Sequence, residues 1–88
     1  MKIIRPACAG TLESGDAYVE VLPGEGKIEL NIESKVLEQF GDEIRASAEA
    51  VIAELNVGGA DIHIIDQGAL DCVIRARLET ALKRGGDA

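Results

Sequence analysis

The sequence contains very few aromatic residues. Among its 88 residues there is no tryptophan, and Tyr18 and Phe40 are the only aromatic side chains. Flat surfaces on which bases or sugar rings could stack are therefore scarce. The apolar fraction is nevertheless 47%, so an aliphatic core is expected. A chain of this length predicts one domain, residues 1–88, with little room for a deep enclosed active site.

Basic residues are also scarce relative to acidic ones. Nine lysines and arginines stand against sixteen aspartates and glutamates, giving a net charge of −7. This negative field disfavours nucleic acid and anionic membrane surfaces as partners. A basic protein surface is the partner that such a charge favours.

Cysteine, histidine and long apolar runs are nearly absent. Cys8 and Cys72 are the only cysteines and His63 is the only histidine, so no zinc-type spacing exists. A secreted disulfide scaffold of this size usually has more cysteines. We therefore expect both thiols to be reduced, small buried hydrophobes in a cytoplasmic protein. No run approaches the ~18 apolar residues of a membrane span, and residues 1–6 do not resemble a secretory signal.

Alternating apolar residues and turn formers predict four strands. The predicted strands are residues 7–12, 17–22, 28–32 and 61–65. The first three are predicted to form a β-meander, with a hairpin turn at residues 23–26. The last strand places His63 on the face opposite Ile62 and Ile64, as a partly exposed strand histidine.

Two amphipathic helices are predicted in the second half of the chain. The first follows Ser34 as its N-cap, runs for about five or six turns and ends at Asn56. Gly41 inside it costs about 1 kcal/mol relative to alanine, and close packing against the sheet is one explanation for it. The second follows Asp66 as its cap and stops at residues 85–86. The predicted apolar stripes are Leu37, Phe40, Ile44, Ala48, Val51 and Leu55 in the first helix, and Leu70, Val73, Ile74, Leu78, Ala81 and Leu82 in the second.

The predicted order is therefore β-β-β-α-β-α, in an α+β fold. A small, mainly antiparallel sheet with both helices packed on one face buries these stripes economically. The other face, with Glu29, Asn31 and Glu33, is expected to meet solvent or a partner.

Ser14 is the strongest candidate for a functional residue. It lies in a predicted turn, Glu13-Ser14-Gly15-Asp16. A nucleophile elbow needs glycine where Leu12 stands, and only His63 is available as a base, so no catalytic residue and no metal ligand is predicted. A serine of this kind suits modification by another protein. Glu13, Gly15 and Asp16 are candidate recognition residues, although such acidic groups are equally often a solvated edge.

Three stretches resemble the acyl carrier (γ) subunits of citrate lyase. They are residues 6–16, 39–45 and 68–79, and the likeness covers nearly the whole chain in one register. The resemblance implies that Ser14 carries 2′-(5″-phosphoribosyl)-3′-dephospho-CoA through a phosphodiester, attached by a transferase. The thiol of this arm would carry acetyl and citryl thioesters. The α subunit would exchange acetyl for citryl, and the β subunit would cleave citryl to oxaloacetate. The carrier itself would catalyse nothing.

Two other hypotheses remain open. One is a carrier with the same prosthetic group in malonate decarboxylase or citramalate lyase. The other is a small interaction protein or sulfur carrier, whose activated tail the Gly85-Gly86 pair resembles, with no group on Ser14. The helical carriers of fatty-acid synthesis do not fit, because the first half of this chain is rich in strands and lacks their Asp-Ser-Leu motif.

Overall fold

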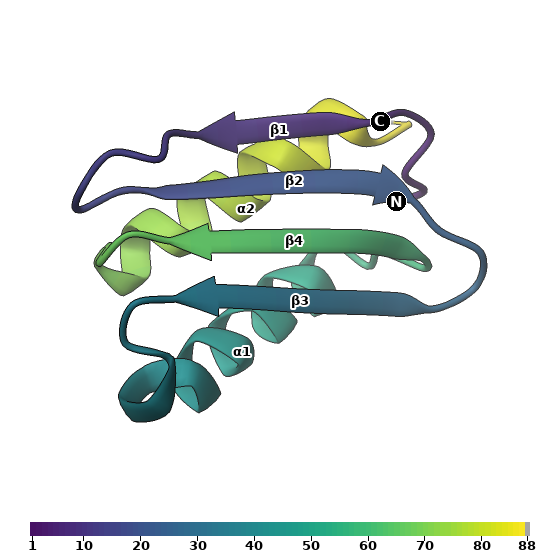
Figure 1. Cartoon of the computed structure of the whole chain (residues 1–88). Coiled ribbons are helices and arrows are strands. Elements are labelled where there is room, and N and C mark those ends of the chain that lie inside the picture. The colour runs from purple at the N-terminus through teal and green to yellow at the C-terminus, as the bar shows by residue number, and fades with distance from the viewer. Residues whose placement is uncertain (88) are drawn as a thin grey trace.

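The chain folds into one sheet with two helices on the same face (Figure 1). The computed structural model describes residues 1–87. The predicted α+β class and element order are confirmed. The elements are β1 (Ala7–Gly10), β2 (Ala17–Pro23), β3 (Ile28–Ser34), α1 (Leu37–Glu54), β4 (Ala60–Asp66) and α2 (Asp71–Gly85).

The strand order is β1-β2-β4-β3, so the predicted meander is wrong. The pairs β1–β2 and β2–β4 are antiparallel, whereas β3 and β4 are parallel. β4 takes the interior position because Ile62 and Ile64 are fully buried on one face and Ile65 is half-buried on the other. The acidic strand β3 suits an edge. A parallel pair needs a crossover, and α1 supplies it.

The turn at residues 23–26 is consequently not a hairpin. It carries the chain past the end of β4, where the Ala60 N–H donates to the Lys27 carbonyl over 3.1 Å. Position 24 favours glycine, because the Cβ of any other residue would lie only 2.8 Å from the Ala60 nitrogen. Residues 23–26 do form a turn, but the strand after it pairs with β4 and not with β2, because long-range packing sets the strand order.

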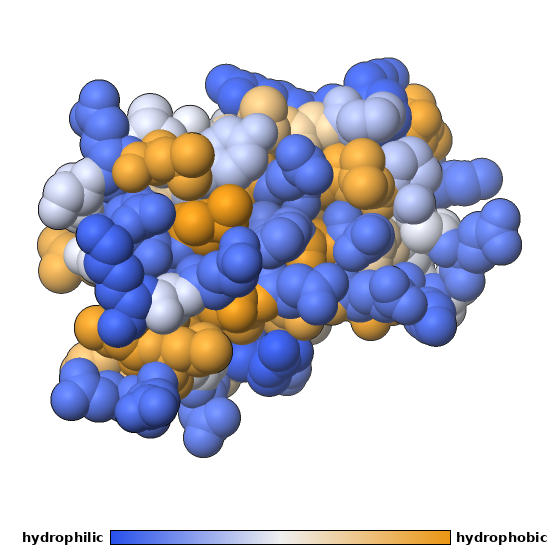
Figure 2. Space-filling view, in the orientation of Figure 1, coloured by the Kyte–Doolittle hydropathy of each residue, from blue (hydrophilic) through white to orange (hydrophobic). Residues whose placement is uncertain are grey.

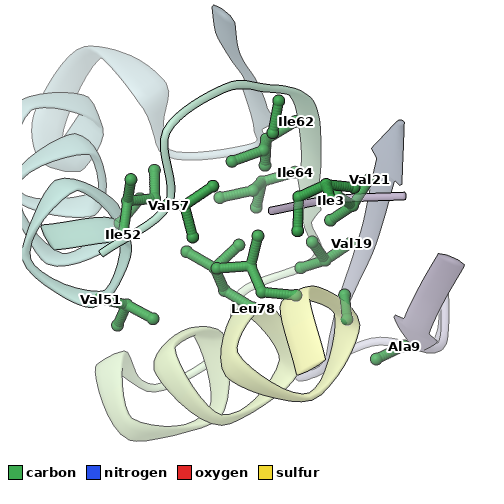
Figure 3. Packing of buried hydrophobic residues seen from close by; sticks show 14 residues of the cluster. Ile3, Ala9, Val19, Val21, Val51, Ile52, Val57, Ile62, Ile64 and Leu78 are labelled. Atoms are coloured by element: carbon green, nitrogen blue, oxygen red, sulfur yellow. The ribbon is translucent and has the colours of Figure 1, made fainter. Parts of the chain in front are cut away.

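The core between sheet and helices is aliphatic (Figure 3). Val19 and Val21 of β2 and Ile62 and Ile64 of β4 point towards Leu78 of α2 and the buried side of α1. Burial of such a side chain contributes about 1.5–3 kcal/mol. The inward positions alternate with outward ones along β2 and β4, as a sheet with one covered face requires.

The first helix begins later than the sequence predicts. Ser34 is not its N-cap, because α1 starts at Leu37 and the Ser34 hydroxyl donates to Asp66 Oδ2 over 2.8 Å. Leu37 and Phe40 remain 46% and 45% exposed, since the first turn of α1 projects past the edge strand β3 (Figure 1). The predicted end is confirmed, with Asn56 at φ +53°.

The second helix also begins later, at Asp71. Asp66 does not cap it: Oδ1 of Asp66 accepts the N–H groups of Gly68 and Ala69, and so closes the turn that precedes the helix. Leu70, which the sequence places in the apolar stripe, is 73% exposed. Val73 is half-buried, while Ile74, Leu78, Ala81 and Leu82 are buried as predicted, and the stop at Gly86 is confirmed.

The expectation that both cysteines are buried is wrong. Cys8 and Cys72 are exposed free thiols and not buried hydrophobes, because Cys8 alternates with the inward-facing Ala9 and Cys72 lies in the first turn of α2. Hydrogen bonding with the Cys8 thiol raises the pKa of Tyr18.

A Cβ on Gly41 would meet the Leu37 side chain of its own helix at 3.1 Å, not the sheet.

The uncovered face of the sheet is polar along β3 and mixed along β2, where Tyr18 and Leu22 point outward. Glu29, Asn31 and Glu33 are exposed there, and His63 Nε2 lies 3.0 Å from Glu33 Oε2. The partly exposed strand histidine is confirmed. Within residues 1–87, no helix is both long and apolar enough to cross a membrane.

Candidate functional site: the turn around Ser14

Ser14 lies in the connection between β1 and β2, and its side chain is exposed. We call residues 11–16 the Ser14 turn. The connections from β3 to α1 and from β4 to α2 lie at the same end of the sheet (Figure 1), which we call the Ser14 end. The predicted location of Ser14 between the first two strands therefore agrees with the structure.

Hydrogen bonds within the Ser14 turn define its shape. The Asp16 N–H donates to the Glu13 carbonyl over 3.0 Å, and the Glu13 N–H donates to Thr11 Oγ1 over 3.2 Å. Gly15 has φ +85° and a Cβ there would meet nothing within 4 Å. Glycine is therefore favoured at this position by its backbone conformation, and the space beside Ser14 is open.

Asp16 joins the Ser14 turn to α2. Its carboxylate accepts two hydrogen bonds from Arg77, at 3.0 Å from Nε to Oδ1 and 3.0 Å from Nη2 to Oδ2. It also accepts the Thr11 hydroxyl over 2.7 Å and the Ala17 N–H over 2.7 Å. These donors, with Arg77 the largest contributor, hold the pKa of Asp16 far below its ordinary value. The Asp16 side chain is only 16% exposed, so its charge is directed inward.

Two backbone hydrogen bonds attach the Ser14 turn to the connection between β4 and α2. The Gly15 N–H donates to the Gln67 carbonyl over 2.7 Å, and the Gln67 N–H donates to the Asp16 carbonyl over 2.9 Å. They continue the β2–β4 ladder, whose last pair is Ala17 and Asp66. The residues that follow Ser14 make these hydrogen bonds, and the bonds fix the position of the turn that presents the exposed Ser14 hydroxyl.

His63, the only histidine of the sequence, lies away from Ser14 and does not act as its general base. His63 lies three residues along β4 from Asp66, about 10 Å of strand, and it contacts Glu33 on the uncovered face of the sheet. Among the described residues there is no cluster of side chains that could hold a metal ion. Within residues 1–87, the arrangement can present a hydroxyl to another protein, and it brings neither His63 nor a metal-binding cluster to that hydroxyl.

The structure separates the three candidate recognition residues. Glu13 and Gly15 are exposed beside Ser14, whereas Asp16 is turned towards Arg77. Sequence reasoning missed Arg77, Thr11 and Gln67 as parts of the site. Arg77 is 61 positions from Asp16 and looks like any polar helix residue, so no local signal pointed to it.

Comparison with known proteins adds three findings. A family model described as "ACP: Malonate decarboxylase delta subunit (MdcD)" matches residues 4–85. The citrate lyase acyl carrier protein of Yersinia enterocolitica serotype O:8 / biotype 1B (strain NCTC 13174 / 8081) is 53% identical over 88 residues, covering 99% of this chain and 91% of that protein. A chain in the crystal structure of a Pseudomonas malonate decarboxylase hetero-tetramer in complex with malonate superposes with a TM-score of 0.81 at 26% identity, covering 98% of this chain and 93% of that one.

Proposed function

Because the chain belongs to the family of acyl carrier proteins of citrate lyase and malonate decarboxylase, we propose that Ser14 is the residue that carries its prosthetic group. The protein is a carrier subunit and not a catalyst. It functions as the acyl carrier of a citrate lyase, the complex named for the relative that is 53% identical. The assignment to Ser14 rests on its exposed hydroxyl, which lies on a turn held by the hydrogen bonds of the neighbouring residues. His63 is not placed to act on this hydroxyl as a base.

The proposed group is 2′-(5″-phosphoribosyl)-3′-dephospho-CoA, joined to Ser14 Oγ by a phosphodiester. The open space around Gly15 lets a transferase approach the hydroxyl. That enzyme must supply a base that takes the hydroxyl proton and a donor whose phosphate carries a leaving group, so that the new Oγ–P bond forms as the bond from phosphorus to that group breaks. The thiol at the far end of the arm would then hold acetyl and citryl groups as thioesters. A tethered arm makes their delivery to the α and β subunits intramolecular, which raises the effective concentration.

Intact-mass spectrometry of the protein from its native host tests this assignment. We expect a mass gain of one phosphoribosyl-dephospho-CoA unit, lost in Ser14→Ala. Thr80→Ala is the matched control, since Thr80 is another exposed hydroxyl, on α2, and the gain should persist there. Ser14→Ala should change the free energy of unfolding by no more than about 0.5 kcal/mol, as expected for a surface substitution. An unmodified mass in cells that ferment citrate would contradict the proposal.

A carrier of malonate decarboxylase is the second candidate, favoured by the similarity to the Pseudomonas structure. The acyl group on the arm distinguishes the two. A citryl thioester on the purified protein supports the citrate lyase carrier, and a malonyl thioester supports the decarboxylase carrier. An acetyl thioester fits both, because loss of CO2 from a malonyl thioester also leaves acetyl on the arm.

A further inference from the structure

Arg77 of α2 contacts the fold at both ends of the Ser14 turn. Its guanidinium donates two hydrogen bonds of 3.0 Å to the Asp16 carboxylate, one from Nε and one from Nη2. Its Cδ lies 3.1 Å from the place that a Cβ on Gly10 would take, so the aliphatic part of the side chain passes close to the residue before the turn. Figure 2 shows the molecule in the orientation of Figure 1, with the end that carries the Ser14 turn at its left edge, open to solvent.

A chain of hydrogen bonds runs from Arg77 to the residue that precedes Ser14. Asp16, which Arg77 holds, accepts the Thr11 hydroxyl over 2.7 Å. Thr11 Oγ1 in turn accepts the Glu13 N–H over 3.2 Å, and the Glu13 carbonyl accepts the Asp16 N–H over 3.0 Å. The backbone on both sides of the Ser14 hydroxyl therefore depends on the orientation of the Asp16 carboxylate.

The two sides of the Ser14 turn are supported differently. The residues that follow Ser14 are held by backbone hydrogen bonds that join Gly15 and Asp16 to Gln67. The segment that precedes Ser14 is held through the side chains of Thr11 and Asp16. Loss of the partner that orients Asp16 should therefore loosen the segment before Ser14, while the backbone ladder of the sheet stays intact.

The geometry of the ion pair suits a positioning role. An arginine that binds a carboxylate through two N–H donors fixes the orientation of the carboxylate as well as pairing its charge. The Asp16 side chain is mostly buried, whereas the Arg77 side chain is partly exposed. A partly exposed ion pair contributes little to global stability. Its effect should therefore be concentrated on the Ser14 turn.

We propose that Arg77 is a positioning residue for the modification of Ser14, and that it acts through Asp16 to keep the Ser14 turn in the conformation that the transferase binds. This inference rests on the proposed function. A turn that already has the bound conformation avoids the entropy cost of ordering on binding. When a turn is competent for only a fraction of the time, the apparent dissociation constant rises by the inverse of that fraction. The ion pair thus acts on the binding of the carrier by the transferase, and not on the transfer step.

Steady-state kinetics of the transferase, with the unmodified carrier as the varied substrate, test this role. Arg77→Met should raise the KM for the carrier about tenfold with kcat unchanged, as for a turn that is competent about one-tenth of the time. Arg77→Lys should give an intermediate KM, because lysine keeps the charge but lacks the two paired donors. Arg75→Met is the matched control and should leave the KM unchanged. Arg75 lies on the same helix at the same exposure, 42% against 41%, and its partner is Asp71.

Asp16→Asn distinguishes a role through Asp16 from a direct contact of Arg77 with the transferase or its donor. Asparagine keeps the size of aspartate but loses the charge that Arg77 binds. Because Arg77 acts through Asp16, the variant with both substitutions should be no poorer a substrate than the poorer single variant. Additive losses, or a raised KM for the donor in Arg77→Met, assign Arg77 to a direct contact and overturn the proposal.

Amide hydrogen exchange reports on the turn without the transferase. The Asp16 N–H, which closes the turn on the Glu13 carbonyl, should exchange at least about tenfold faster in Arg77→Met, whereas the amides of the interior strand β4 should be unchanged. A raised KM without faster exchange, or faster exchange without a raised KM, overturns the inference. Intact mass of the wild-type chain after reaction with the transferase is the separate check, since an unmodified Ser14 there overturns the proposed function itself.

Discussion

Asp16 is the residue on which the shape of the Ser14 turn depends most. Its carboxylate collects hydrogen bonds from the Thr11 hydroxyl, the Ala17 N–H and two nitrogens of Arg77. A carboxylate with a bidentate arginine partner is held in one orientation. The residue therefore supports Ser14 from inside the fold, while Glu13 is the acidic neighbour that faces solvent.

Replacing Arg77 by methionine should raise the pKa of Asp16 towards its ordinary value of 3.8, because the principal donor to the charged form is lost. A pKa lowered on folding adds stability above the unfolded value, and that contribution is lost as the pH falls through the folded value. The native turn should thus keep its shape at neutral and mildly acidic pH. Titration of the Asp16 carboxyl carbon by NMR measures the shift.

Arg75→Met is the matched control for this titration. Arg75 pairs with Asp71 on the same helix, at 2.9 Å from Nε to Oδ2, and it does not bind Asp16. The pKa of Asp16 should be unaffected by that change. An unchanged pKa of Asp16 in Arg77→Met would show that Arg77 does not hold the carboxylate in solution.

Gly10 and Gly15 flank the Ser14 turn and should respond differently to alanine. Both have positive φ, which costs an alanine about 1–2 kcal/mol. A Cβ at Gly10 would also lie 1.9 Å from the Ala17 carbonyl oxygen, whereas at Gly15 it would meet open space. Urea denaturation should show Gly10→Ala to be at least about 2 kcal/mol more destabilising than Gly15→Ala. Equal losses would mean that the backbone moves away from the added methyl group.

At the scale of elements, α1 joins the edge strand to the interior of the sheet. It connects β3 to its parallel neighbour β4, and from Ile44 onward it packs on the core through Ile44, Ala48, Val51 and Ile52. Its first turn instead leaves Leu37 and Phe40 exposed. One helix thus provides both the crossover of the fold and an exposed apolar first turn at the Ser14 end.

Gly41→Ala should raise the free energy of unfolding by about 0.5–1 kcal/mol. Glycine inside a helix is less stable than alanine by this amount, and the added Cβ would meet only the Leu37 side chain, at 3.1 Å. Leu37 is exposed and can move aside. Denaturant unfolding provides the measurement. Gly59→Ala provides the contrast and should destabilise, because its Cβ would lie 2.9 Å from the backbone nitrogen of Gly26. A loss of stability in Gly41→Ala would show that Leu37 is held in place.

For the molecule as a whole, stability and the proposed function depend on different parts of the chain. The core lies between the middle of the sheet and the helices, and Ser14 lies on a turn at one end (Figures 1 and 3). A small domain has a total stability of only about 5–15 kcal/mol. A core truncation should therefore threaten folding, whereas changes at the Ser14 end should affect binding and modification.

Leu78→Ala should lower the free energy of unfolding by about 2–5 kcal/mol, because Leu78 is fully buried between α2 and the sheet. Leu70→Ala, at the exposed position just before the same helix, should change it by no more than about 0.5 kcal/mol. Thermal or urea unfolding of both variants makes the comparison. Similar losses at the two positions would contradict the division between core and surface.

Local patterns in the sequence determined the elements and their order. The alternation in β4 and the spacing of the apolar residues in α2 depend only on the geometry of a strand or a helix. The sequence therefore predicts both elements without knowledge of any tertiary contact. The sequence also predicts the turn around Ser14, because its glycine and short polar residues favour a turn through their local backbone conformation and hydrogen bonds. The likeness to citrate lyase carriers was visible at the same level.

Only the tertiary structure decided how those elements meet. The insertion of β4 between β2 and β3, the pairing of Arg77 with Asp16 and the inward use of Ser34 and Asp66 all join residues far apart in the chain. The exposure of Cys8, Cys72 and Phe40 depends equally on what lies beside them. A side chain's type constrains its local conformation, but its partner is set by the packing of the whole core, and so the support of Ser14 appears only in the folded molecule.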